Sequence, residues 1–234
     1  MNRELGTQIE ITPAIDKLLD ATEKIVRKGT ILDRRGNIRC PVIENTIPPQ
    51  LLRNQALLAQ LGIFRKYPRQ ERPTAVMGAS EPGDLFAATT GALYRYPTIV
   101  TSRIHEGPPQ QSDLNVWYAG NGDDRVFIGG VPTATENISN TLAIRTGDLE
   151  GVGSVAVFYG LCRTGNDARQ IDLGLKKLGV EKVHHIYAAA IDVGERSGIQ
   201  QLIDCGISAF ATVRYKGVDG TGKIHMSTED RMRR

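Results

Sequence analysis

The sequence predicts an α/β domain built on a doubly wound parallel sheet. Its last third carries most of this prediction, because three strand-like segments alternate there with two helix-like segments. Strands are expected at 154–159, 183–191 and 207–213, and helices at 168–178 and 195–205. Strands that alternate with helices of this length are typical of right-handed parallel crossovers.

The middle of the chain repeats this order. A short apolar run at 74–77 ends in a glycine and leads to a helix-like segment at 83–93 that is rich in Ala and Thr. Pro97–Thr101 then reads as the next strand. This strand, loop, helix and strand favour another parallel crossover.

The first part of the chain is expected to be mainly helical. Residues 12–28 carry an apolar stripe at helical spacing. A turn signal at 34–37 predicts a short hairpin within 30–46. A second helix is expected from about Pro49, with Gly62 ending it.

Residues 104–150 interrupt the regular alternation and read as an inserted hairpin or flap. Val126–Ile128 is expected to be a strand, and a short helix is expected near 138–144. We therefore divide the chain into N-terminal helices and a hood, an α/β core that contains the flap, and a loosely held polar tail: 1–70, 71–216 and 217–234.

Composition limits the function classes. Of 234 residues, 40% are hydrophobic and 24% charged, which is typical of a packed domain. A net charge of +3 is too small to indicate nucleic acid but suits a small anionic ligand. The three cysteines lack disulfide or zinc spacing, so we expect a reducing, cytoplasmic location and no metal-ligand cluster. No apolar run approaches the roughly 18 residues of a membrane span, so no membrane partner is expected.

The loop before residue 168 is the best-marked candidate site. A strand followed by a Thr/Gly loop and a helix start brings free backbone N–H groups and the positive helix end together, which suits a phosphate. Arg163 can add a charged fork and Thr164 a hydroxyl donor. The alternative is that Asn166 or Asp167 only caps the helix. The candidate phosphate-binding residues are Cys162, Arg163, Thr164, Gly165, Asn166 and Asp167.

Two further loops follow predicted strands. The loop Gly78–Gly83 is a glycine-rich strand-to-helix turn, which is either an anion site or an ordinary turn. Its candidate ligand residues are Ala79, Ser80, Glu81 and Gly83. The loop 192–198 can hold a ribose or a base, or Asp192 can simply cap the next helix. Arg103, His105 and Glu106 follow another strand and either reach a ligand or lie in a solvated loop.

The sequence resembles the type I phosphoribosyltransferases, and the orotate enzymes in particular. The resemblance rests on the segment Val155–Asp167, on the helix and strand after it, and on the loop Gly78–Gly83, which is similar to the family's pyrophosphate loop. It covers about residues 70–215 and implies the family's fold, a homodimer, and an N-terminal hood that closes on a base. The implied ligands are phosphoribosyl pyrophosphate (PRPP), ribose 5-phosphate or a nucleoside monophosphate.

The chain departs from the family at the ribose. Where the family has two adjacent acidic residues that hold the ribose hydroxyls or the magnesium site, this chain has Tyr159 and Gly160. Neither can act as a carboxylate, so these sugar-facing positions argue against Mg²⁺. The lysines expected after Arg103 are also absent.

Three functions remain open. The first is a diverged enzyme that transfers or cleaves at ribose C1, with Arg103, Glu81 and Asp192 as candidate catalytic residues and Glu106 or Asp192 replacing the lost carboxylates. The second is a binding protein that senses a nucleotide or sugar phosphate without turnover. The third is an unrelated dinucleotide enzyme, which is disfavoured because no GxGxxG follows a strand.

Overall fold

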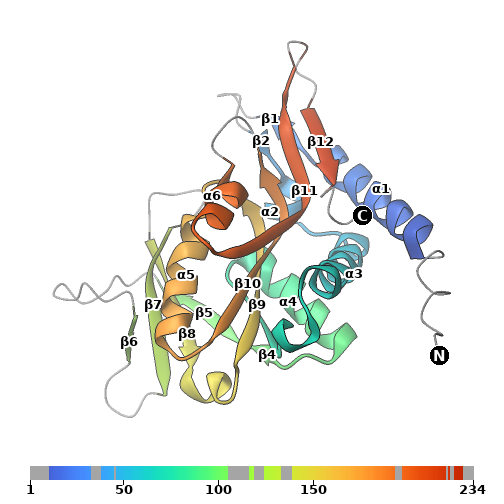
Figure 1. The fold of residues 1–234 in the computed structure, drawn as a ribbon. Coiled ribbons are helices and arrows are strands. Elements are labelled where there is room, and N and C mark those ends of the chain that lie inside the picture. The colour runs from blue at the N-terminus through green and yellow to red at the C-terminus, as the bar shows by residue number, and fades with distance from the viewer. Residues whose placement is uncertain are drawn as a thin grey trace, which may run out of the picture.

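A six-stranded sheet forms the centre of the molecule (Figure 1). The structure is a computed structural model, and it describes residues 11–32, 38–44, 46–104, 116–118, 124–132, 139–192, 197–219, 221 and 224–228. The sheet contains β3 (Ala75–Gly78), β4 (Thr98–Ile99), β9 (Ser154–Cys162), β10 (Lys182–Ile191), β11 (Ser208–Val218) and β12 (Ile224–Thr228).

The sheet is doubly wound, as predicted. Its strand order is β12-β11-β10-β9-β3-β4, and every neighbouring pair is parallel except β11 with β12. From β3 the chain moves outward to β4, then returns to β9 on the other side of β3 and continues to β11. The direction of winding therefore reverses between β3 and β9, and this is the topological switch point.

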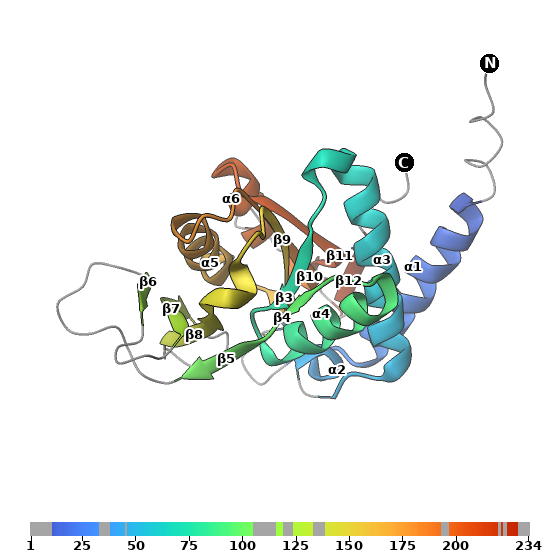
Figure 2. The same ribbon diagram turned by 90° about the horizontal axis from the view of Figure 1, so that it is seen from below.

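Helices cover both faces of the sheet (Figures 1 and 2). One face packs against α5 (Asn166–Lys177) and α6 (Gly198–Asp204). The other packs against α1 (Ile11–Lys28), α3 (Pro49–Lys66) and α4 (Glu81–Tyr94). The short elements are α2 (Pro41–Glu44) and the 3-10 turns η1 (Arg69–Glu71) and η2 (Thr146–Leu149).

The three long parallel strands share an irregularity near their carboxyl ends. Tyr159 packs on the α5 side, Leu161 on the α3 side, and Cys162 again on the α5 side. Regular alternation would place Tyr159 and Leu161 on one face. The same irregularity falls at Ala188 in β10 and at Thr212 in β11, and Oγ1 of Thr212 lies 2.6 Å from the carbonyl oxygen of Ala188.

The segment predicted as a flap contributes a second, antiparallel sheet of order β5-β8-β7-β6. Its strands are β5 (Thr101–Ile104), β6 (Val116–Tyr118), β7 (Arg125–Pro132) and β8 (Ser139–Arg145). The helix predicted near 138–144 is wrong, because β8 pairs with both β5 and β7 and buries Leu142 and Ile144. Ile128 of β7 packs on Gly174 of α5, where a Cβ would lie 2.7 Å from its Cγ2.

The N-terminal segment also differs from expectation in one place. The short hairpin is confirmed by β1 (Ile31–Leu32) and β2 (Ile38–Arg39), while its turn at 33–37 lies outside the described residues. Gly62 does not end α3, which continues to Lys66 because Ile63 is fully buried.

The tail beyond residue 217 was predicted to be loosely held because it is polar, but part of it pairs with the central sheet. Residues 224–228 form β12 along β11. Arg27 of α1 donates to the carbonyl of Ile224 at 2.8 Å, so the tail is tied to the first helix.

Candidate ligand site at the carboxyl edge of the sheet

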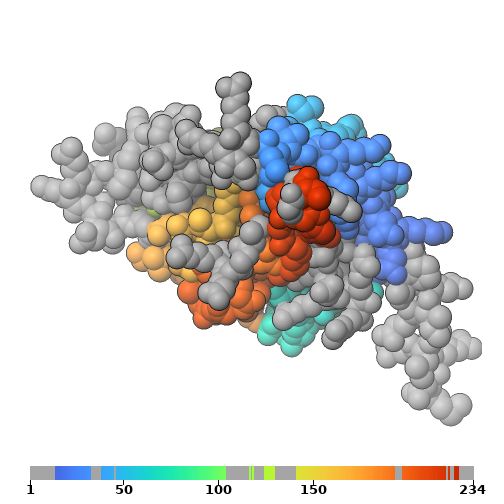
Figure 3. Space-filling view, turned by 90° about the horizontal axis from the view of Figure 1, so that it is seen from above, coloured from blue at the N-terminus to red at the C-terminus, as the bar shows by residue number. Residues whose placement is uncertain are grey.

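Two loops meet at the switch point between β3 and β9. One joins β3 to α4 and the other joins β9 to α5. In open α/β sheets, ligands bind beyond the carboxyl ends of the strands at this point. Figure 3 views the molecule from above and shows the blue N-terminal segment next to yellow and orange residues of β9 and α5.

Ser80 joins the two loops. Its Oγ accepts the N–H of Gly83 at 3.1 Å, which caps α4, and lies 3.3 Å from the N–H of Gly160 on β9. The N–H of Ala79 donates to the carbonyl of Phe158 at 3.0 Å. Gly83 is required here because a Cβ would lie 2.1 Å from that same carbonyl oxygen.

The β9–α5 loop connects a strand to a helix start, as predicted, but it is shorter than expected. β9 runs through Cys162, so Gly160 to Cys162 belong to the strand and the loop is 163–165. Gly165 adopts φ +72, a left-handed conformation that disfavours a side chain. Gly198 of α6 packs against the loop, since its Cβ would lie 2.8 Å from the carbonyl oxygen of Arg163.

The loop's side chains point in different directions. Arg163 donates to Glu44 Oε1 at 3.2 Å and to the carbonyl of Ile38 at 3.1 Å, so its guanidinium holds the N-terminal segment. Thr164 and Asn166 are exposed beside the helix start. The Thr164 hydroxyl lies 3.5 Å from the N–H of Asn166.

Asp167 and Cys162 line the inner side of the loop. Asp167 Oδ1 accepts the N–H of Ala168 at 2.8 Å and the hydroxyl of Tyr187 at 3.2 Å, and burial raises the pKa of this carboxyl. Burial also raises the pKa of the Cys162 thiol, with the charge of Asp167 adding to the effect. Cys162 is therefore a neutral packing residue, and the carboxyl of Asp167 caps its own helix.

The prediction that the side chain of Tyr159 faces a sugar is wrong. It points into the core under α5, 1% exposed, and its hydroxyl lies 2.8 Å from Nδ1 of His185. Its ring stacks on Tyr187 with centroids 4.4 Å apart. The wrong prediction is explained by the irregularity in β9. Tyr159 lies before it, with its side chain under α5, and the strand continues to the carboxyl edge of the sheet at Cys162.

Gly160 lies at the edge, but its side-chain direction is filled. A Cβ there would lie 3.0 Å from Pro82 Cβ and 3.2 Å from Ile43 Cγ2. The short helix α2 thus packs where a carboxylate would have to stand. These two positions do not fit a magnesium ion, and the described residues contain no cluster of three His, Cys, Asp or Glu side chains suited to a metal.

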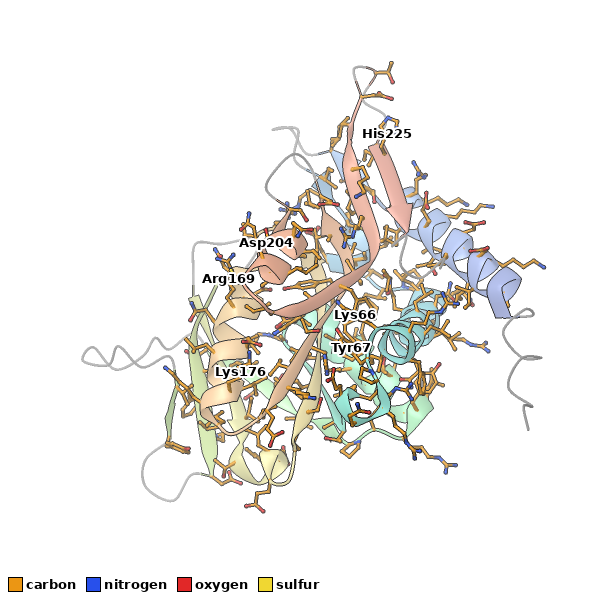
Figure 4. All side chains as sticks on the ribbon, in the orientation of Figure 1. Lys66, Tyr67, Arg169, Lys176, Asp204 and His225 are labelled. Atoms are coloured by element: carbon orange, nitrogen blue, oxygen red, sulfur yellow. The ribbon has the colours of Figure 1, made fainter. Side chains whose placement is uncertain are left out.

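A buried polar chain extends from Tyr159 under α5. Nε2 of His185 lies 3.5 Å from Asp172 Oδ1, too long for a well-formed hydrogen bond, and Asp172 Oδ2 pairs with Lys176 at 2.8 Å. Burial opposes ionisation of Asp172, but His185 and Lys176 outweigh it and lower the pKa. Figure 4 shows Lys176 on α5, at the outer end of this chain.

Arg103 lies beside the β3–α4 loop. It pairs with Asp84 Oδ2 at 2.8 Å, and Thr101 Oγ1 lies 3.2 Å from Oδ1 of the same carboxylate and 3.0 Å from the carbonyl oxygen of Gly78. Glu81 is exposed at the first position of α4. Asp84 was not among the predicted site residues. An acidic residue in the first turn of the helix after a candidate loop could have indicated it.

Asp192 lies at the end of β10 and is held by two cations. Its Oδ2 is 2.6 Å from Lys216 and 3.3 Å from Arg214. Burial raises its pKa, but the hydrogen bonds from Lys216 and Ser197 and the nearby positive charges outweigh this, so the pKa is lowered. His105, Glu106 and residues 193–196 lie outside the described residues.

His184 and one hollow of the surface do not belong to this site. His184 is buried, bonds the carbonyl of Glu71 at 2.7 Å and packs against the ring of Tyr67 at an interplanar angle of 39°, as a structural residue does. A hollow of about 470 Å³ lined by residues 146, 149–153, 178 and 179 lies at the opposite end of β9.

No helix among the described residues combines the length and apolar content that crossing a bilayer requires.

Solved structures similar to this chain include adenine phosphoribosyltransferases. The enzyme from Trypanosoma brucei, in complex with AMP, pyrophosphate and ribose-5-phosphate, has a TM-score of 0.57 and 13% identity over 84% of this chain and 78% of that one. The Giardia lamblia enzyme, complexed with 9-deazaadenine, has a TM-score of 0.57 and 12% identity over 85% and 98%. The chain has the type I phosphoribosyltransferase fold.

Comparison of the sequence with family models and curated proteins gives no assignment beyond the fold. No family model and no curated protein matches the chain. The Thermoanaerobacter pseudethanolicus adenine phosphoribosyltransferase aligns over 84% of this chain and 99% of that one, yet at 14% identity. The resemblance inferred from the sequence is thus confirmed for the phosphoribosyltransferase fold, while its orotate-like refinement stays a prediction.

Proposed function

We propose that this chain binds a ribose 5-phosphate moiety at the switch point and transfers or cleaves at ribose C1 of a nucleobase-like compound. The observation that carries the proposal is the Ser80 hydroxyl, which contacts backbone N–H groups of α4 and β9 and so fixes the two candidate loops beside each other. The phosphoribosyltransferase fold adds general support.

Each part of the proposed site has its own role in this proposal. Backbone N–H groups of the 163–166 segment and the Thr164 hydroxyl anchor the 5′-phosphate at the start of α5. The base lies under the N-terminal segment, which Arg163 and Glu44 fasten to the loop. Glu81 and Arg103 would face ribose C1, where the carboxylate of Glu81 would stabilise an oxocarbenium-like state and the guanidinium of Arg103 would donate to the leaving group.

The base itself is a further proposal. Our sequence resemblance implies a pyrimidine, orotate-like acceptor, whereas the matching solved structures are adenine enzymes. Assays with orotate and with adenine in parallel distinguish the two.

Isothermal titration with ribose 5-phosphate, PRPP, AMP and UMP tests the binding proposal. At least one of these should bind, and Thr164→Ala should weaken the binding about three- to tenfold, the usual value of one hydrogen bond to a charged group. Thr221→Ala, at an exposed position between β11 and β12, is the matched control. Absence of binding by all four ligands would refute the proposal.

A binding protein without turnover is the second candidate. It is favoured by the packing of Pro82 and Ile43 close to the Cβ position of Gly160, where the family resemblance implies an acidic residue. It predicts binding that EDTA does not change. Release of pyrophosphate or of free base in the presence of ligand excludes it.

We also propose a homodimer, in a reducing cytoplasmic location. From Leu85 to Tyr94, α4 carries no charged residue, and Leu85 and Leu93 are 50% and 52% exposed. An apolar, uncharged helix face of this kind is suited to a second copy of the chain. Light scattering of the wild type and of Leu93→Glu tests it: the wild type should be a dimer, and the variant a monomer.

A further inference from the structure

Arg169 lies at the end of the first turn of α5, directly after the candidate phosphate loop. Its backbone N–H donates to the carbonyl of Gly165 at 3.1 Å, so the residue is one helical turn away from that loop. Side chains of a helix lean toward its amino end and cover the turn before their own Cα. The side chain of Arg169 therefore leans toward the turn that contains Gly165 and the exposed Asn166. Figure 4 shows Arg169 near the α6 end of α5.

The guanidinium of Arg169 has no hydrogen-bond or ion-pair partner within the part of the chain that the structure describes. The side chain is half-buried, and its Nε is shielded from solvent without an acceptor. Arginine is always charged and offers five donors, and a shielded donor without an acceptor costs stability. A ligand with acceptor oxygens would supply the missing bond.

The two carboxylates nearest to Arg169 along α5 are bound to other groups. Asp172, three residues later, pairs with Lys176 at 2.8 Å. Asp167 lies two residues earlier, a spacing at which helical side chains do not face each other, and it accepts the hydroxyl of Tyr187 at 3.2 Å. The positive charge of Arg169 is therefore left for a group outside the helix.

A cation at this end of a helix works against the helix dipole, whose amino end is itself positive. The basic residues of the last turn of α5, Lys176 and Lys177, are at the end where cations stabilise a helix. Residues that break such a local rule are expected at functional sites. A bound anion removes the conflict, because the helix end and the guanidinium of Arg169 then attract the same charge.

We infer that Arg169 is the side chain that pairs with the 5′-phosphate at the start of α5 and so determines the specificity for a phosphate monoester at ribose C5. This inference rests on the proposed function, and it adds a charged fork to the backbone N–H groups and the Thr164 hydroxyl of that site. The planar guanidinium matches two oxygens of a phosphate. Arg163, which the sequence indicated for this role, already has Glu44 as a partner at 3.2 Å.

Isothermal titration with ribose 5-phosphate, AMP and UMP tests the inference, because these ligands have the ribose 5-phosphate group in common. Arg169→Gln should weaken each ligand that the wild type binds by about ten- to a hundredfold, the usual loss for a hydrogen bond between charged groups. Arg169→Lys keeps the charge without the fork, so its affinities should lie between those of Arg169→Gln and the wild type. Without ligand, Arg169→Gln should unfold at nearly the same temperature as the wild type, because it loses no bond within the protein.

Arg53→Gln, at an exposed position of α3 on the other face of the sheet, is the matched control for the loss of one positive charge. It should change no affinity by more than about twofold, because distant exposed charges are screened. A loss smaller than tenfold in Arg169→Gln, or an equal loss in Arg53→Gln, overturns the inference and leaves the proposed function standing. If Arg169→Gln does not fold, wild-type affinity in Arg169→Lys overturns it equally. If the wild type binds none of these ligands and no PRPP, the proposed function falls together with the inference.

Discussion

The hydroxyl of Ser80 lies 3.3 Å from the backbone N–H of Gly160, and this contact connects two loops separated by 80 residues in the chain. The same oxygen caps α4 through Gly83. A side chain of two heavy atoms therefore sets the spacing of the candidate site. Its removal affects both helix stability and loop position.

Ser80→Ala should lower the free energy of unfolding by about 1–2 kcal/mol, because the cap of α4 is lost and the N–H of Gly160 loses a partner. Thermal unfolding should show a fall of roughly 2–8 °C for a chain of this size. Thr221→Ala, at an exposed position between β11 and β12, should change the midpoint little. An unchanged midpoint in Ser80→Ala would mean that the contact does not hold the loops.

Gly160→Asp should not restore an acidic ribose site. The new side chain would meet Pro82 and Ile43 and bury a charge, which costs about 1–3 kcal/mol through overpacking alone. Denaturant unfolding should show this loss without any gain in Mg²⁺-dependent binding. A variant that is as stable as the wild type and binds Mg²⁺ would contradict the packing described here.

Gly165→Ala should destabilise the protein through two separate effects. The residue has φ +72, and the new Cβ would lie 2.9 Å from Leu202 Cγ. Gly179→Ala provides the matched control, since Gly179 has φ +90 and nothing within 4 Å of its Cβ position. The control should lose about 1 kcal/mol from backbone strain, and Gly165→Ala should lose more. Equal losses would show that the contact with α6 is soft.

Stability should fall as the pH drops from 7 toward 4, partly because of His184. Burial lowers the pKa of this histidine from 6.5 to about 4, so the unfolded chain binds a proton in this range that the folded chain does not. The neutral form is therefore required for folding, and the loss begins as the pH falls below 6.5. His184→Gln should flatten this part of the stability profile, measured by urea unfolding at several pH values, while the exposed His225→Gln should not. A profile that His184→Gln leaves unchanged would assign the pH dependence to other groups.

Much of the fold was predictable because its signals are local. The strands β9, β10 and β11 are nearly continuous apolar runs, and Gly179 and Gly206 follow the helices between them. The positions of the two loops follow from these elements, and both loops were predicted.

The misses have a different origin. The family resemblance placed the side chain of Tyr159 toward a sugar, but the face that a side chain takes near the ends of β9, β10 and β11 depends on pairing among strands far apart in sequence. Arg163 could not be matched to Glu44 for the same reason, since 119 residues separate them. β8 was taken for a helix because its apolar residues are too few to distinguish the two patterns without its partners.

The packing of Ile43 and Pro82 against Gly160 has a consequence for redesign as well as for stability. Any side chain at position 160 requires these neighbours to move, because its Cβ would lie 3.0 Å from Pro82 Cβ and 3.2 Å from Ile43 Cγ2. Any engineering of metal-dependent transfer into this scaffold should begin with Ile43 and Pro82 and reach residue 160 last.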